Sequence, residues 1–144
     1  MKTKEIIAEY TNRKNRIKAL SEELKYLEKA PEFVKVTHYG EELTKSHIDI
    51  EDVHIRILDK KRNLEMQIAI DQGFTAKINM ALASLKLRIG AREYEVFDLR
   101  HLKERNLDYI AIKCGYAYPS SIHKKLKKQE AMFEKMLNVD EGPS

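Results

Sequence analysis

The N-terminal part of the chain carries apolar side chains at alternating intervals of three and four residues. Within residues 3–29 the a and d positions of this heptad pattern are Ile6, Tyr10, Arg13, Ile17, Leu20, Leu24 and Leu27. All of them except Arg13 are apolar or aromatic, and such spacing is typical of a helix that buries one stripe rather than of a strand. We therefore expect a long helix, which ends before Pro31 because proline cannot continue it.

A polar segment separates this helix from a second helical pattern. Residues 30–46 are expected to form a loop with a brief extended piece at residues 33–36. Over about residues 48–71 the apolar positions return at near-helical spacing. They are Ile50, Val53, Ile57, Leu64 and Ile68. Carboxylates in the first turn, Asp49 among them, lie at the positive end of the helix dipole, so we predict a second long helix.

Gly73 interrupts this second pattern, and a shorter third helix is predicted beyond it. Residues 75–88 begin a further apolar stripe at helical spacing. Its members are Ile78, Ala81, Leu82, Leu85 and Ile89. Gly90 is expected to end the third helix, since glycine readily adopts the left-handed backbone found at helix C-termini.

The first two predicted helices have similar lengths, each spanning about 35–40 Å at roughly 1.5 Å per residue. They can pair as an antiparallel hairpin within one chain, or the first helix can form a parallel coiled coil with a second copy. In the parallel dimer Glu9 would attract Lys14, whereas Glu23 would repel Glu28, so this pairing is not strongly encoded. We favour the hairpin, whose outer face still allows dimerisation.

Shorter helical patterns follow, beginning with residues 92–103. This segment presents Tyr94, Phe97 and Leu102, with Val96 and Leu99 available to a second contact. Asn106 can cap the next helix, because its side-chain oxygen accepts from a free backbone N–H. Ala111 lies four residues before Gly115, as a helix-turn-helix requires: the small residue lets two helices approach and the glycine allows the turn. The side chains expected to face inward are Ile110, Ala111 and Cys114.

The last predicted helix separates an apolar side from a basic side. Pro119 fits its first position, where the missing N–H does no harm. The apolar side consists of Ile122, Leu126, Gln129, Phe133, Met136 and Leu137, and the opposite side of Ser120, Lys124, Lys127 and Lys128. Between Tyr109 and Gln129 there are five lysines and no carboxylate. Because a helix fits the major groove of DNA and lysines attract phosphates, this pattern predicts a DNA-binding helix.

The composition favours an all-α protein of the cytoplasm. Charged residues make up 35% of the 144 residues, with only five Gly and three Pro, which favours helix over sheet. The net charge of +4 is compatible with a nucleic-acid partner. A single cysteine excludes an internal disulfide, and no apolar run approaches the roughly 18 residues that a membrane span needs. The start of the chain also lacks the apolar core of a signal peptide.

These patterns together predict three segments and no enzyme. We expect a long helical hairpin at residues 1–74, a helix-turn-helix domain at residues 75–138 and a tail at residues 139–144. The glycines are too scattered for a phosphate-binding loop, and the five histidines show no metal-ligand spacing. Cys114 lies where a scaffold helix packs, with no adjacent base. We therefore expect no catalytic residue, no metal and no cofactor.

The segment 92–128 resembles the region-4 helix-turn-helix of bacterial sigma factors. In particular it is similar to the shortened version in phage transcription regulators of the ArpU and RinA type. The features that carry the resemblance are a leading helix at residues 94–102, the pair Ile110-Ala111, then Gly115-Tyr116, and Ser121-Ile122 opening a recognition helix with a basic continuation. The Leu-rich N-terminal helix and the polar loop also match this layout. Here Tyr118-Pro119 lengthens the turn by about one residue, and no arginine opens the recognition helix.

The resemblance implies a phage or prophage transcription regulator, such as an activator of late genes. Such a protein would bind double-stranded DNA as a dimer, contact RNA polymerase and associate with the nucleoid in the host cytoplasm. Base edges would be contacted by Ser120, Ser121, His123 and Lys124, and phosphates by Lys125, Lys127 and Lys128.

Two other functions stay open at the level of sequence. A small terminase subunit recognises packaging DNA with a helix-turn-helix and assembles through helical hairpins, but there the DNA-binding unit usually lies at the N-terminus. A protein-only modulator of RNA polymerase or of a sigma factor would instead bind an acidic protein surface with the basic helix.

Overall fold

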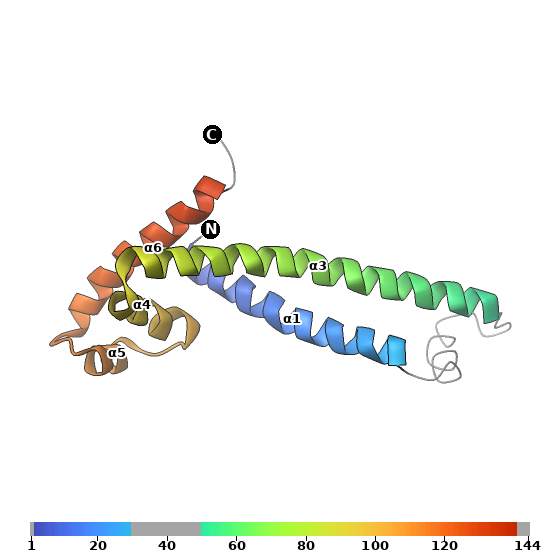
Figure 1. The fold of residues 1–144 in the computed structure, drawn as a ribbon. Coiled ribbons are helices and arrows are strands. Elements are labelled where there is room, and N and C mark those ends of the chain that lie inside the picture. Colours follow the sequence, from blue (N-terminus) through green and yellow to red (C-terminus); the bar gives the residue numbers. More distant parts are fainter. Residues whose placement is uncertain (1, 30–49, 141–144) are drawn as a thin grey trace. The chain divides into compact units, whose positions relative to one another are not determined.

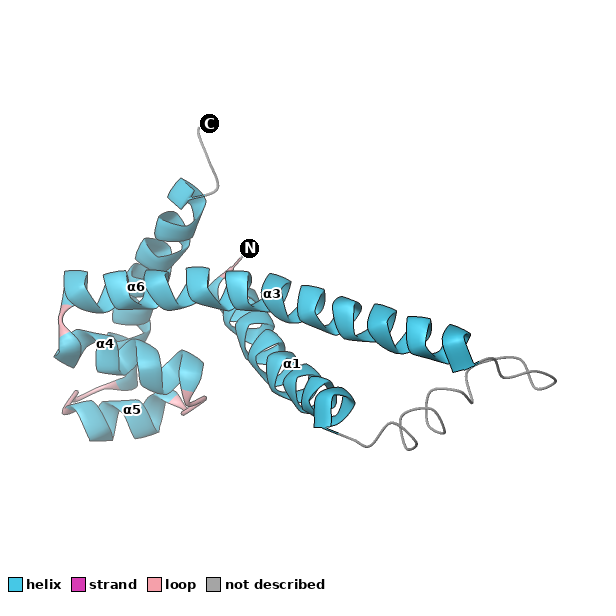
Figure 2. Cartoon of the chain, turned by 45° about the vertical axis from the view of Figure 1, so that its right-hand side comes forward, coloured by secondary structure: helices cyan, strands magenta, loops and turns pink. Residues whose placement is uncertain are grey.

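Every regular element in the described part of the chain is a helix (Figures 1 and 2). The computed structural model describes residues 2–29 and 50–140, and no strand occurs within them. In chain order the elements are α1 (Thr3–Lys29), α3 (Ile50–Ile89), α4 (Ala91–Phe97), the π-helical turn η1 (Asp98–Leu102), α5 (Leu107–Cys114) and α6 (Pro119–Asp140). The predicted all-α class is confirmed. The loop and extended piece expected at residues 30–46, and the expected start of a helix at residue 48, lie outside the described residues.

Helix α3 runs without interruption through Gly73, so the predicted break at this residue is wrong. A glycine within a helix costs only about 1 kcal/mol relative to alanine. The buried stripe continues on both sides of Gly73, through Ile68 before it and through Thr75 and Ile78 after it. Burial therefore outweighs the low helix propensity of one glycine. The helix ends instead at Gly90, whose φ of +89° an L side chain rarely adopts.

The described residues divide into two compact units, and α1 and α3 each contribute to both. Residues from 12 to 74 belong to the first, which we call the hairpin unit. Residues up to 11 and from 75 onward belong to the second, the C-terminal unit. The sequence pattern placed the beginning of α1 in the hairpin. The structure differs because the buried Thr3 and Tyr10 of α1 bond to partners in the C-terminal unit.

The hairpin unit is an antiparallel pair of helices, as we expected from the sequence. Its buried cluster is formed by Leu27, Val53, Ile57 and Leu64, with Leu20 and Leu24 packed against it. Arg16 of α1 pairs with Asp71 of α3, whereas Glu23, further along α1, lies 3.6 Å from Lys60, which comes earlier in α3. The residue number thus rises along α1 while that of its partner in α3 falls, so the two helices of this chain run antiparallel.

Asp71 is a fully buried carboxylate in the hairpin unit. The Arg16 guanidinium donates to both of its oxygens, with Nε 2.6 Å from Oδ2 and Nη2 2.5 Å from Oδ1. Arg13 adds a second cation, 3.6 Å from Oδ1. The hydrogen bonds from Arg16 lower the pKa of Asp71, although desolvation of the carboxylate acts in the opposite direction. Asp71 therefore stays ionised and paired while it is buried.

Candidate nucleic-acid interface

Two short-range features set the start and the end of α5. The Asn106 side-chain oxygen accepts a hydrogen bond of 2.8 Å from the Tyr109 N–H, so the predicted cap is present. At the other end Gly115 has a φ of +78°, and the Tyr116 N–H donates to the Ala111 carbonyl at 2.8 Å. This left-handed turn ends α5. Helix α6 then begins at Pro119, as the sequence predicted.

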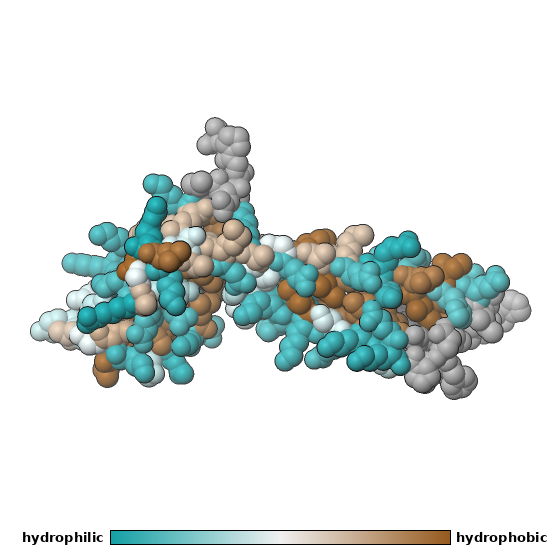
Figure 3. All heavy atoms as spheres, in the orientation of Figure 1, coloured by the Kyte–Doolittle hydropathy of each residue, from teal (hydrophilic) through white to brown (hydrophobic). Residues whose placement is uncertain are grey.

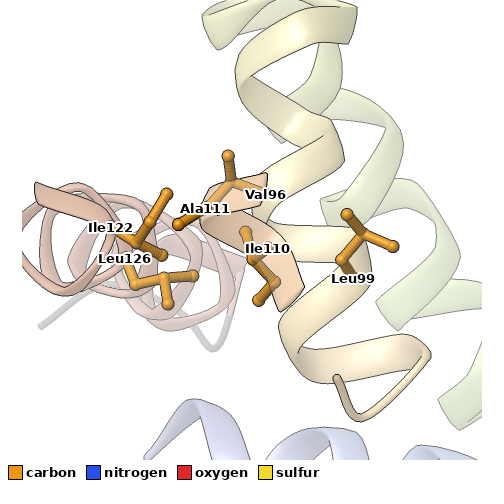
Figure 4. Close-up of a cluster of buried hydrophobic side chains, with 6 residues drawn as sticks. All are labelled: Val96, Leu99, Ile110, Ala111, Ile122 and Leu126. Carbon is orange, nitrogen blue, oxygen red and sulfur yellow. The ribbon is translucent and has the colours of Figure 1, made fainter. Parts of the chain in front are cut away.

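A closed apolar core holds α4, η1, α5 and α6 together (Figure 4). It consists of Val96, Leu99, Ile110, Ala111, Ile122 and Leu126, with Leu107, Cys114 and Tyr116 packed against it. Ala111, with its single methyl group, lies between larger side chains of the neighbouring helices, as the close approach of two helices requires. The expected inward positions of α5, Ile110 and Ala111, are both buried. The core therefore fixes α5 and α6 as a bent pair.

The same side of α6 remains buried further along the helix. Phe133 is fully buried, and its ring centroid lies 5.4 Å from that of Phe97 in α4. Four other residues of the predicted apolar side are buried, namely Ile122, Leu126, Gln129 and Leu137, and Met136 is half-buried. The apolar side that the spacing predicted for α6 is thus the side that packs on the C-terminal unit.

The opposite side of α6 is exposed and basic. We call it the basic face of α6 and define it by Ser120, Lys124, Lys127, Lys128 and Lys135, all of which are exposed. Ser121 and His123, the other residues proposed to read bases, are exposed at its margins. Lys135 lies beyond the carboxylate-free run at residues 110–128 that predicted the basic side, so the pattern did not include it. The structure thus brings six of the seven predicted site residues to the surface of one helix.

Lys125 differs from the other predicted site residues. It is half-buried, its ammonium pairs with the Glu93 carboxylate of α4, and it lies 5.2 Å from the centre of the Tyr116 ring. The hydrogen bonds to Glu93 and, to a smaller extent, to Tyr116 raise the pKa of Lys125. Gln129, one turn later, donates to the Glu93 carbonyl at 2.8 Å. These contacts fasten α6 to α4, and no sequence signal pointed to Glu93.

An open hollow of about 550 Å³ lies along one edge of the basic face. Lys124 and Lys128 border it, and Ile89 and Met132 supply apolar lining. The hollow is also lined by the acidic residue Glu93, whose carboxylate is already paired with Lys125. The two lysines at this edge therefore give the hollow a cationic rim.

The described residues carry little that suggests other chemistry. No group of three or more His, Cys, Asp or Glu side chains among them could hold a metal ion. Across residues 2–29 and 50–140, no helix combines the length and the apolar character needed to cross a membrane. Cys114 is half-buried against the core, and this burial raises the pKa of its thiol.

Comparisons of the chain with protein-family models, with curated proteins and with solved structures found no match.

Proposed function

We propose that this protein is a DNA-binding transcription regulator of phage or prophage origin, acting in the host cytoplasm. The observation that carries the proposal is the exposed basic face of α6, presented by a bent helix pair whose other side is a closed core. A helix fits the major groove, and the second helix of such a pair is the one that enters it. The resemblance of residues 92–128 to sigma region 4 supports transcription as the process, with late-gene activation as the role.

The exposed residues of α6 divide into two roles in this proposal. Ser120, Ser121, His123 and Lys124 lie in the first turns of α6, the part of a recognition helix that contacts base edges. Lys127 and Lys128 contact phosphates, which sets affinity rather than sequence preference. We now assign Lys125 to holding α6 against α4, because its ammonium is already paired with Glu93.

We propose further that the hairpin unit joins two copies of the chain. The outer side of its α3 segment carries large apolar residues that are each more than half exposed, namely Ile55, Leu58, Met66 and Ile70. Figure 3 shows hydrophobic residues of this kind at the surface, among hydrophilic ones. Asp59 and Arg62 lie between them and carry opposite charges. Such a face suits a twofold interface, in which one patch meets its own copy.

Sedimentation equilibrium tests the dimer. We expect a mass of twice the 16.9 kDa of one chain. Met66→Glu combined with Ile70→Glu should shift the protein to the monomer, because two carboxylates would be buried in the interface. Met80→Glu is the control for the methionine substitution, because Met80 is an exposed methionine of α3 outside the hairpin unit. This variant should leave the mass unchanged. A monomeric wild type refutes the dimer, and a large closed ring would support the small-terminase alternative.

Two large exposed side chains outside the basic face favour contact with a protein. Ile112 on α5 is 83% exposed, and Tyr118 in the turn is 69% exposed. Neither residue belongs to the basic face of α6. Exposed apolar residues of this size suit a protein partner, and RNA polymerase is the partner that we propose. A protein-only modulator of polymerase would use the same residues and would bind no duplex.

Fluorescence anisotropy with a labelled duplex, measured across a salt series, tests DNA binding itself. If each protomer neutralises about four phosphates, the logarithm of the binding constant should fall with the logarithm of the salt concentration with a slope near −3.6 per protomer. This slope reports counterions released from DNA, so a duplex of mixed sequence is sufficient. Absent binding, or binding that does not respond to salt, would contradict the proposed function.

A further inference from the structure

The first turn of α1 is fixed against α6, far away in the sequence. Thr3 is only 2% exposed, and its hydroxyl donates to Glu134 Oε2 at 2.7 Å. The Thr3 N–H also points to this oxygen, at 3.3 Å, and the hydroxyl lies 3.4 Å from the Glu130 carbonyl. Within the same unit, Tyr10 bonds through its hydroxyl to Asn79 of α3. The beginning of α1 is thus an integral part of the C-terminal unit.

This attachment brings two lysines at the start of the chain, one just before α1 and one in its first turn, beside the basic face of α6. Lys2 and Lys4 flank Thr3 in the sequence, and both are exposed. Together with Lys127 of α6 they line an open hollow of about 390 Å³. Three ammonium groups from two distant parts of the chain therefore border one concave surface.

The two carboxylates of this hollow are turned toward the protein. Glu134 accepts the hydrogen bonds from Thr3, and Glu130 Oε2 lies 3.4 Å from Nε2 of the half-buried His101, whose pKa is lowered chiefly by burial. Both glutamates are half-buried, whereas the three lysines are exposed. The exposed groups of the hollow are therefore cationic, and an anionic partner would meet ammonium groups first.

We propose that Lys2 and Lys4 form a second phosphate-contacting element, which extends the DNA interface from α6 to the first turn of α1. This inference rests on the proposed function, because it names a further part of the same interface. A helix in the major groove is flanked by the sugar–phosphate backbones of both strands, and contacts to them position the protein. Lys127 lies on the side of α6 toward α1, so Lys2 and Lys4 continue its line of positive charge. Thr3 holds both lysines in place before DNA arrives.

The test compares Lys2→Gln/Lys4→Gln with the wild type by anisotropy across a salt series, using a duplex of mixed sequence. Loss of two phosphate contacts should reduce the steepness of the salt dependence by about 1.8 per protomer and weaken binding on the order of 10-fold at about 0.1 M salt. Lys18→Gln/Lys25→Gln is the matched control, since both are exposed lysines of α1 within the hairpin unit and their removal changes the net charge equally. It should leave the salt dependence as it is.

The outcomes separate this inference from the function on which it rests. An unchanged slope for Lys2→Gln/Lys4→Gln, in a protein whose wild type binds duplex with the expected slope, overturns the inference alone. Weaker binding with an unchanged slope also overturns it, because that result indicates an indirect effect on the fold. A wild type that binds no duplex, but binds an acidic polypeptide, overturns both. Circular dichroism confirms that the exposed substitutions leave the helices intact.

Discussion

Replacing Lys124 and Lys128 together by glutamate is expected to weaken duplex binding on the order of 100-fold at about 0.1 M salt. Both lysines are exposed on the basic face of α6, and both border the larger hollow. The double substitution removes one proposed base contact and one proposed phosphate contact. It also places two carboxylates against the anionic DNA, so attraction becomes repulsion. Anisotropy across a salt series should also show a slope that is less steep by about 0.9 per protomer, because Lys128 is the phosphate contact of this pair.

The control for this pair changes the net charge by the same amount, but at two lysines outside the basic face of α6. Lys18→Glu/Lys25→Glu reverses two exposed lysines of α1 in the hairpin unit. We expect this variant to bind within about threefold of the wild type, because neither lysine belongs to the C-terminal unit that carries the basic face. Equal losses in both variants would mean that net charge, rather than the basic face of α6, determines binding.

Replacing Ile110 by alanine should lower the free energy of unfolding by about 2–5 kcal/mol. Ile110 is fully buried in the core that joins α4, η1, α5 and α6 (Figure 4). Its truncation removes apolar contacts and leaves a cavity that the surrounding helices fill only in part. Urea unfolding followed by circular dichroism measures the change, and DNA binding should fail at the urea concentration at which the helix pair unfolds.

Ile112 provides a matched control within the same helix. It is also an isoleucine of α5, two positions later, but it is 83% exposed. Ile112→Ala should change the free energy of unfolding by no more than about 0.5 kcal/mol. Similar losses at the two positions would show that α5 does not pack on α6 with the side that carries Ile110. If polymerase binds this surface, Ile112→Ala should weaken that contact without affecting duplex binding.

The boundaries of the helix-turn-helix could be predicted because each depends on neighbours within a few residues. Asn106 caps α5 through the Tyr109 N–H, and Gly115 turns the chain where an L side chain would be strained. Pro119 opens α6, where its missing N–H is not needed. The burial of α6 also followed from its spacing, since an amphipathic helix must place its apolar side on the core.

Gly73 shows where local propensity fails as a guide. A glycine between two apolar stripes resembles a helix end when only neighbouring residues are considered. In the structure both stripes belong to one buried side of α3, and packing along that side maintains the helix. The cost of one glycine is small compared with the burial of residues such as Ile68 and Ile78, so tertiary contacts decide.

Long-range pairs were inaccessible from the sequence for a different reason. The Lys125–Glu93 pair and the Thr3–Glu134 bond join residues that are 32 and 131 positions apart. Periodicity shows which side of a helix is apolar, but it does not show which other helix that side meets. For this reason Lys125 was grouped with the phosphate contacts, and the first turn of α1 was assigned to the hairpin.

The buried Asp71 favours one alignment of the two helices of the hairpin unit. Leucines and isoleucines can exchange partners when one helix slides past another by a turn, because one apolar contact nearly replaces the next. The carboxylate has less freedom, because its two hydrogen bonds to Arg16 form in one alignment only, and a slide by one turn would leave it at best with Arg13. Every slipped hairpin is thereby disfavoured by one side chain, even though the leucines alone would tolerate it.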